Sequence, residues 1–82
     1  MNVEVRLYGS LRRYRPSDTS GATLQSFVVE MPPGSTVEDL GRALGIPDGF
    51  ISAAAVNNEA VDSASLLADS DRISLFPPSA GG

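Results

Sequence analysis

Two segments of alternating apolar and polar residues, one near each end of the chain, constrain the fold more than any other feature. Residues 2–8, NVEVRLY, and residues 72–76, RISLF, both show the period of two that a strand with one buried face produces. Their inward positions are Val3, Val5, Leu7, Ile73 and Leu75. Because the second segment is strongly apolar, we expect it in the middle of a sheet, with Phe76 facing away from the core.

Residues 24–31, LQSFVVEM, have the same strand character and are expected to form a hairpin with the first strand. The face to be buried would hold Phe27, Val29 and Met31. The arginine-rich residues 11–16, which follow the first strand, are interpreted as a solvated loop or irregular turn. The hairpin therefore closes across a long connection.

Residues 32–45, PPGSTVEDLGRALG, predict the main helix. Ser35 is expected to cap the first free amides, with Glu38 completing a capping box. The apolar stripe of the helix would consist of Val37, Leu40 and Leu44. Gly41 shares that face at a cost of about 1 kcal/mol relative to alanine, so we expect a packing reason for it, such as a close approach to the sheet.

The segment before the last strand predicts several short elements. Residues 53–56 indicate a short strand, and Asn57-Asn58 a turn with left-handed backbone. A brief return strand is expected over residues 59–62, and a buried turn at residues 66–67.

This order of elements predicts an α+β fold, a β-grasp, with a mixed sheet of about four to five strands and one main helix across one face. We assign residues 1–76 to this domain and residues 77–82 to a flexible C-terminal tail that ends in Gly-Gly.

The composition excludes several classes of function. The 82 residues contain no cysteine and no histidine, which removes disulfides, thiolate chemistry and the commonest general base and metal ligand. We therefore expect no bound metal, no bound cofactor and no catalysis by this chain alone. The net charge of −4 disfavours nucleic acid as a partner. Without a long apolar run or secretory signal, we expect a cytoplasmic protein with no membrane association.

Four acidic residues in the last third of the chain are candidates for a metal site, but we interpret them as solvated turn residues: Glu59, Asp62, Asp69 and Asp71. All six basic residues are arginine, so the chain offers no lysine amine to accept an isopeptide bond. In any ubiquitin-like conjugate this chain would supply the carboxylate.

The tail is the candidate functional segment. Pro77 and Pro78 cannot donate to a sheet ladder, so they should end the last strand and send the chain away from the domain. The residues beyond them are small or lack a side chain, which suits a narrow channel: Ser79, Ala80, Gly81 and Gly82. A terminal carboxylate is ionised and unreactive at neutral pH. Its activation as an adenylate requires ATP and Mg²⁺, and since the chain has no phosphate-binding loop, both would belong to a partner enzyme.

Phe76 is the second candidate. Facing outward at the root of the tail, with Tyr8 or Val28 near it on the uncovered face of the sheet, it would form an apolar docking patch. Arg6, Arg12 and Arg13 could flank this patch, and the competing interpretation is that they are simply solvated. The competing interpretation is that Phe76 folds under a loop and belongs to the core.

The sequence resembles the ubiquitin-like sulfur carriers, in particular the small subunit of molybdopterin synthase. The similar segments are VRLYGSLRRY, PPGSTVEDLGRALG, VNNEAV and the ending LFPPSAGG, and they span nearly the whole chain. The Asn-Gly turn usual in that family is Asn57-Asn58 here, and Ser70 replaces a common glycine before the last strand, which puts the geometry of those loops in question.

The resemblance implies a function for the tail. Gly82 would be adenylated by a MoeB/ThiF-like activating enzyme and converted to a thiocarboxylate with sulfur from a sulfurtransferase. The thiocarboxylate would then enter the large subunit of molybdopterin synthase, and Phe76 would match the family's hydrophobic contact position. Three alternatives stay open: a sulfur carrier for cysteine, thiamine or tRNA thiolation, a protein modifier conjugated through Gly82, and an interaction module with an incidental tail.

Overall fold

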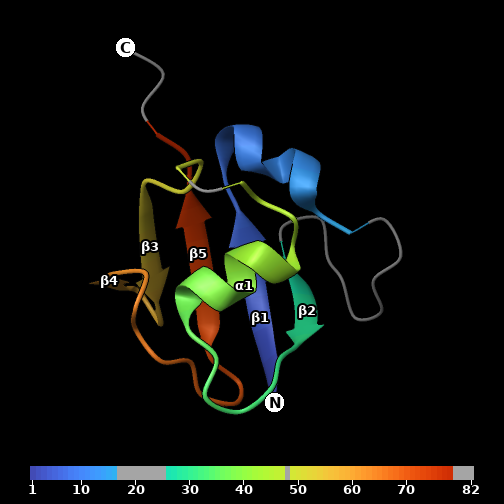
Figure 1. Cartoon of the computed structure of the whole chain (residues 1–82), viewed down its shortest axis with the longest axis vertical. Coiled ribbons are helices and arrows are strands. Elements are labelled where there is room, and N and C mark those ends of the chain that lie inside the picture. Colours follow the sequence, from blue (N-terminus) through green and yellow to red (C-terminus); the bar gives the residue numbers. More distant parts are fainter. Residues whose placement is uncertain (17–25, 48, 79–82) are drawn as a thin grey trace.

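The last strand lies in the middle of the sheet. The computed structural model describes residues 1–16, 26–47 and 49–78. Within them, strands join in the order β2-β1-β5-β3-β4, and α1 crosses one face (Figure 1). The elements are β1 (Asn2–Leu7), the 3₁₀ helix η1 (Gly9–Tyr14), β2 (Phe27–Glu30), α1 (Val37–Ala43), β3 (Ala53–Val56), β4 (Glu59–Val61) and β5 (Arg72–Phe76). β1 and β5 are parallel, and the other neighbouring pairs are antiparallel. The predicted β-grasp fold is confirmed.

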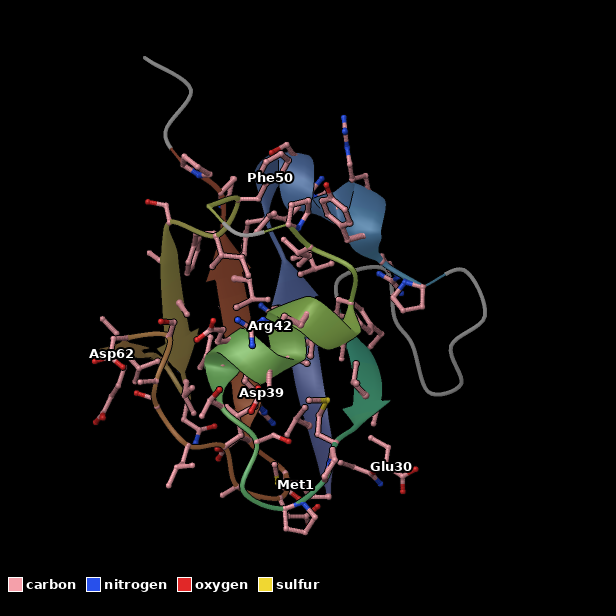
Figure 2. All side chains as sticks on the ribbon, viewed as in Figure 1. Met1, Glu30, Asp39, Arg42, Phe50 and Asp62 are labelled. Atoms are coloured by element: carbon pink, nitrogen blue, oxygen red, sulfur yellow. The ribbon has the colours of Figure 1, made fainter. Side chains whose placement is uncertain are left out.

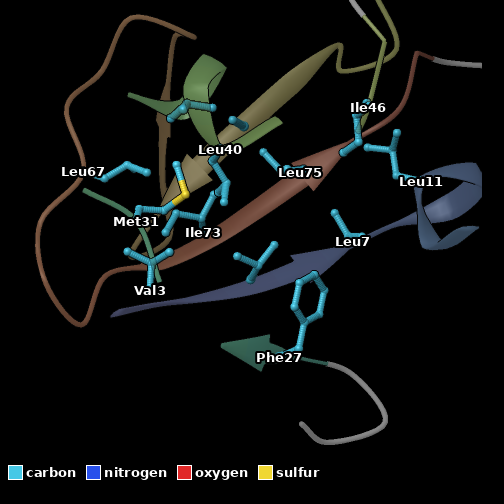
Figure 3. Close-up of a cluster of buried hydrophobic side chains, with 13 residues drawn as sticks. Val3, Leu7, Leu11, Phe27, Met31, Leu40, Ile46, Leu67, Ile73 and Leu75 are labelled. Atoms are coloured by element: carbon cyan, nitrogen blue, oxygen red, sulfur yellow. The ribbon is translucent and has the colours of Figure 1, made fainter. Parts of the chain in front are cut away.

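The core lies between the sheet and α1, and the alternation seen in the sequence decides which residues enter it. β1 and β5 each bury every second residue, and α1 adds Val37 and Leu40 (Figure 3). The fully buried large side chains are Val3, Val5, Leu11, Phe27, Val37, Leu40, Ile73 and Leu75. Burial of each such side chain stabilises the fold by roughly 1.5–3 kcal/mol before the loss of conformational entropy is counted.

The helix begins one residue later than predicted. Thr36 is the N-cap: its Oγ1 accepts a hydrogen bond from the Asp39 amide at 3.2 Å, and Asp39 Oδ2 accepts one from the Thr36 amide at 3.0 Å. The Ser35 hydroxyl instead donates to the Pro32 carbonyl at 2.7 Å, closing the turn before the helix. Glu38 pairs with Arg42 at 2.6 Å on the exposed side of the helix. The prediction of a Ser35 and Glu38 capping box is therefore wrong.

This cap assignment predicts a difference between two variants. Thr36→Ala removes an acceptor for an otherwise unpaired helix amide and should lower the free energy of unfolding by about 1 kcal/mol. Glu38→Ala removes only an exposed i,i+4 ion pair, for which about 0.3–0.5 kcal/mol is typical. Urea denaturation of both proteins provides the measurement, and a larger loss for Glu38→Ala would contradict the assignment.

Three local predictions are corrected by packing. Residues 9–14 form η1 rather than a loop, and Leu11 within it is 1% exposed. Leu67 is buried, but Leu66 is 71% exposed, so only half of the predicted buried turn exists. The packing reason for Gly41 is a side chain and not the sheet, because a Cβ there would lie 2.9 Å from Ile51 Cδ1.

The two turns that depart from the family pattern keep left-handed backbone without glycine. Asn57, Asn58 and Ser70 have φ of 52°, 72° and 70°. The Asn57 side chain donates to Asp71 Oδ1 at 3.0 Å and accepts from the Arg72 amide at 3.0 Å. These bonds hold the end of β3 against the start of β5, so the strain of the left-handed backbone is offset locally.

The acidic residues near β5 serve the turns. Asp69 accepts from the Asn2 amide and Asp71 from the Ala68 amide, both at 2.8 Å, and Asp62 accepts from the Ala64 amide at 3.0 Å. Among residues 1–16, 26–47 and 49–78, no group of three or more potential metal ligands forms. In that same part of the chain, no helix is long and apolar enough to cross a membrane.

Candidate functional site

The candidate site is the end of β5, where the chain leaves the sheet. The Phe76 carbonyl accepts from the Ser52 amide at 2.8 Å, and the Leu75 carbonyl accepts from the Tyr8 amide at 3.1 Å. β5 is thus held on both sides up to its last residue. It ends at Phe76, directly before Pro77, as predicted from the missing proline N–H.

Tyr8 and Phe76 form a stacked pair at this end of the sheet. Their ring centroids are 4.7 Å apart and their planes differ by 16°. Both residues are half-buried, and Phe76 lies on the face opposite the buried Leu75. Phe76 is therefore not a core residue. We call Tyr8 and Phe76 the aromatic pair.

The strand register separates Val28 from the aromatic pair. Val28 is opposite Glu4 on β1, and Glu4 is opposite Arg72, at the other end of β5 from Phe76. Its side chain is 42% exposed on the uncovered face. Since four strand positions correspond to about 13 Å, the structure joins Tyr8 to Phe76 but does not bring Val28 to them.

Small residues surround the aromatic pair on the sheet. Ala53 pairs with Phe76, and Ala55 pairs with Ser74, which is also the partner of Arg6 on β1. Ala53 and Arg6 are exposed. The rings thus border a shallow surface on which a partner could approach the backbone closely.

Charge differs between the two ends of β5. Exposed Arg12 and Arg13 lie in the last turn of η1, which contacts β5 and follows Tyr8. Asp69 and Asp71 lie in the turn that leads into β5 at its other end. The described turns nearest the two ends of β5 therefore differ in charge, with arginines in η1 at the Phe76 end and aspartates at the Arg72 end.

Sequence reasoning did not single out Phe50. Its side chain is 47% exposed, in the connection between α1 and β3, and Figure 2 shows it at the end of the molecule from which the chain leaves β5. The bond from the Ser52 amide to the Phe76 carbonyl holds this connection beside the last strand. An aromatic residue directly after the Asp-Gly turn was the only signal for Phe50 in the sequence.

The predicted site residues divide into two groups. Tyr8 stacks on Phe76 where the chain leaves β5, Pro77 and the exposed Pro78 follow, and the exposed Arg12 lies in the last turn of η1. The four beyond them lie outside the described residues, and their roles stay predictions: Ser79, Ala80, Gly81 and Gly82.

A mixed sheet crossed by one helix, with the chain leaving its central strand beside a half-buried aromatic pair, defines a ubiquitin-like β-grasp protein. A model of the ThiS family matches residues 5–82, and the chain belongs to this family. It is a ThiS/MoaD-like protein, a sulfur carrier or a ubiquitin-like modifier.

Solved structures of similar proteins share this fold. Small archaeal modifier protein 1 of Haloferax volcanii is 24% identical, with a TM-score of 0.67 over 95% of this chain and 98% of that one. Another H. volcanii protein, solved in solution, is 26% identical, with a TM-score of 0.73 over 100% and 87%. A chain of the complex between subunits 1 and 2 of molybdopterin-converting factor from Helicobacter pylori is 27% identical, with a TM-score of 0.59 over 100% of both chains. None of the curated proteins matches this sequence.

Proposed function

We propose that this protein carries sulfur for molybdopterin biosynthesis as a thiocarboxylate on Gly82. The observation that carries the proposal is the aromatic pair, Tyr8 and Phe76, at the root of a tail whose last residues have no side chains. The pair gives a partner an apolar surface to grip, while the tail offers only backbone and a carboxylate to its active site.

The chemistry divides between this chain and its partners. An activating enzyme of the MoeB/ThiF type would join the Gly82 carboxylate to AMP from ATP·Mg²⁺, releasing pyrophosphate. A sulfurtransferase persulfide would displace AMP, and a second thiol would cleave the resulting acyl disulfide to leave the thiocarboxylate. This chain would supply a positioned terminal carboxylate and final residues that have no side chains. It is therefore a carrier and not a catalyst.

A large synthase subunit is the proposed acceptor partner. The support is the similarity to a chain of the H. pylori complex, in which subunit 1 of molybdopterin-converting factor is bound to subunit 2. The thiocarboxylate would enter that subunit's active site and transfer sulfur to the pyranopterin precursor, and two such transfers would form the dithiolene. The small side chains around Phe76 suit a partner surface that lies flat on the sheet.

Mass spectrometry tests the proposal directly. After incubation with the cognate activating enzyme, ATP·Mg²⁺ and a sulfurtransferase with cysteine, we expect the intact chain to gain one sulfur in place of one oxygen, located at Gly82. Alkylation of the thiocarboxylate should then add one group to a chain that has no cysteine. An unchanged mass with all components active would refute the proposal.

A second function, protein modification, is favoured by the similarity to small archaeal modifier protein 1. The absence of lysine makes this chain a donor only, so conjugates would contain it once per acceptor lysine and never as isopeptide-linked chains of itself. In cell lysates, adducts of this protein on lysines of other proteins would support modification.

A further inference from the structure

Pro77, the first residue after β5, packs against the backbone of Gly9, a residue that has no side chain. Gly9, the first residue of η1, has a φ of +56°, and a Cβ built on it would lie 2.8 Å from Pro77 Cγ and 3.5 Å from Pro77 Cδ. A real Cβ essentially never comes that close to a carbon atom, so the proline ring occupies the space that any other residue at position 9 would fill. Gly9 is exposed and Pro77 half-buried, which places this contact at the surface.

The support under this contact is rigid. The Tyr8 amide donates a hydrogen bond to the Leu75 carbonyl, and the Leu11 amide donates one to the Tyr8 carbonyl, both at 3.1 Å. Leu11 anchors η1 in the core at 1% exposure. The backbone on either side of Gly9 is therefore fixed to the sheet and to the core.

Packing helps to orient the chain at this point because the backbone has lost its hydrogen-bond donors. Neither Pro77 nor Pro78 has an N–H group, so no sheet ladder can direct the first residues beyond Phe76. The fixed φ of proline and the surface beneath the Pro77 ring then contribute to the direction of the chain. Stacking on Tyr8 holds Phe76, and the Pro77 ring that follows packs against Gly9.

We propose that Gly9 and Pro77 form a seat that sets the direction in which the tail leaves the domain, and that Gly9 is thereby a positioning residue for charging of Gly82. The second part rests on the proposed function. Five residues beyond Pro77 reach at most about 17 Å when extended, so a change of about 20° at the seat would shift the region that the carboxylate can reach by up to about 6 Å. A displacement of about 1 Å in a reacting group can cost roughly 100-fold in rate.

The chain offers a matched control for the strain of left-handed backbone. Gly9→Ala adds a Cβ both at positive φ and against Pro77, whereas Gly34→Ala adds one at a φ of +87° with no atom within 4 Å. Both variants should lose stability because alanine is strained at positive φ, and only the first should disturb the seat. The Gly9→Ala, Pro77→Ala double variant lacks the proline ring carbons that the new Cβ would meet. Its loss of kcat in charging should therefore not exceed that of Pro77→Ala alone.

ATP–pyrophosphate exchange with the cognate activating enzyme measures the effect. We expect Gly9→Ala to lower kcat roughly 10- to 100-fold, with a nearly unchanged KM because the aromatic pair still docks. Gly34→Ala should retain wild-type kinetics. Equal kinetics for the Gly9→Ala and Gly34→Ala proteins would overturn the positioning role. It would also be overturned if the double variant lost kcat by the product of the two single losses, as independent substitutions do.

Nuclear magnetic resonance tests the seat without any partner. The wild-type protein should show nuclear Overhauser effects between the Gly9 α protons and the Pro77 ring protons, and the Gly34→Ala protein should keep them. Their absence in the wild-type protein would overturn the inference. If the activating enzyme does not charge the wild-type chain, the sulfur-carrier proposal fails, while these proton contacts still decide whether the seat exists.

Discussion

Removal of Gly82, or addition of one alanine after it, is expected to abolish charging of the tail by its activating enzyme. Either change moves the carboxylate by one residue, about 3.5 Å in an extended chain, away from the position at which ATP is attacked. Since reacting groups must approach to about 3–3.5 Å, we expect a loss of at least roughly 100-fold in ATP–pyrophosphate exchange. The domain itself should be unaffected, because residues 77–82 follow the last strand.

The controls for this experiment are the thermal midpoint and an exposed substitution elsewhere. Both tail variants should melt at the wild-type temperature, which separates a charging defect from unfolding. Leu66→Ala removes a side chain that is 71% exposed and outside the site, and it should be charged normally. Undiminished exchange by the protein without Gly82 would show that charging does not depend on this residue and would refute its proposed role as the charged terminus.

Phe76→Ala should weaken binding to the activating enzyme about 30-fold, which corresponds to about 2 kcal/mol for a central aromatic contact residue. The phenyl ring is half-buried and stacks on Tyr8 at 4.7 Å, so its loss removes part of the apolar surface and lets the Tyr8 ring move. Titration calorimetry with the purified enzyme measures the change in Kd.

Val28→Ala is the matched control for Phe76→Ala. Val28 is an apolar residue on the same uncovered face, 42% exposed, but at the far end of the β1 and β5 register. Its truncation should change the Kd by less than about twofold if the contact is centred on the tail root. Equal effects of the two substitutions would show that the partner covers the whole face, and wild-type affinity of Phe76→Ala would contradict docking at the aromatic pair.

The strands were predictable because alternating apolar and polar residues indicate both an extended conformation and the face that is buried. The pattern in residues 72–76 predicted a central strand with Phe76 outward, and both are confirmed. The N-cap residue of α1 was not predictable from the sequence, because Ser35 and Thr36 are both good N-cap residues. The choice between them depends on the turn that Ser35 closes with Pro32. Leu11 was missed because a single apolar residue among arginines has no period.

The site was predictable only where it follows from a strand. Phe76 was found because its direction is set by the neighbouring Leu75. Tyr8 was paired with it only as one of two options, and the register excludes the other, Val28. Phe50 and the contact between Gly9 and Pro77 depend on where a loop and η1 lie in space, which no local pattern in the sequence encodes.

The central place of β5 has a consequence for biosynthesis. β1 emerges first from the ribosome, yet its parallel neighbour is the last strand, and β3 pairs with that strand on its other edge. Contact order is therefore high, and the two halves of the sheet cannot join before residues 72–76 have been translated. A nascent chain without residues 72–76 thus lacks the aromatic pair, so under the proposed function an activating enzyme would not dock on it.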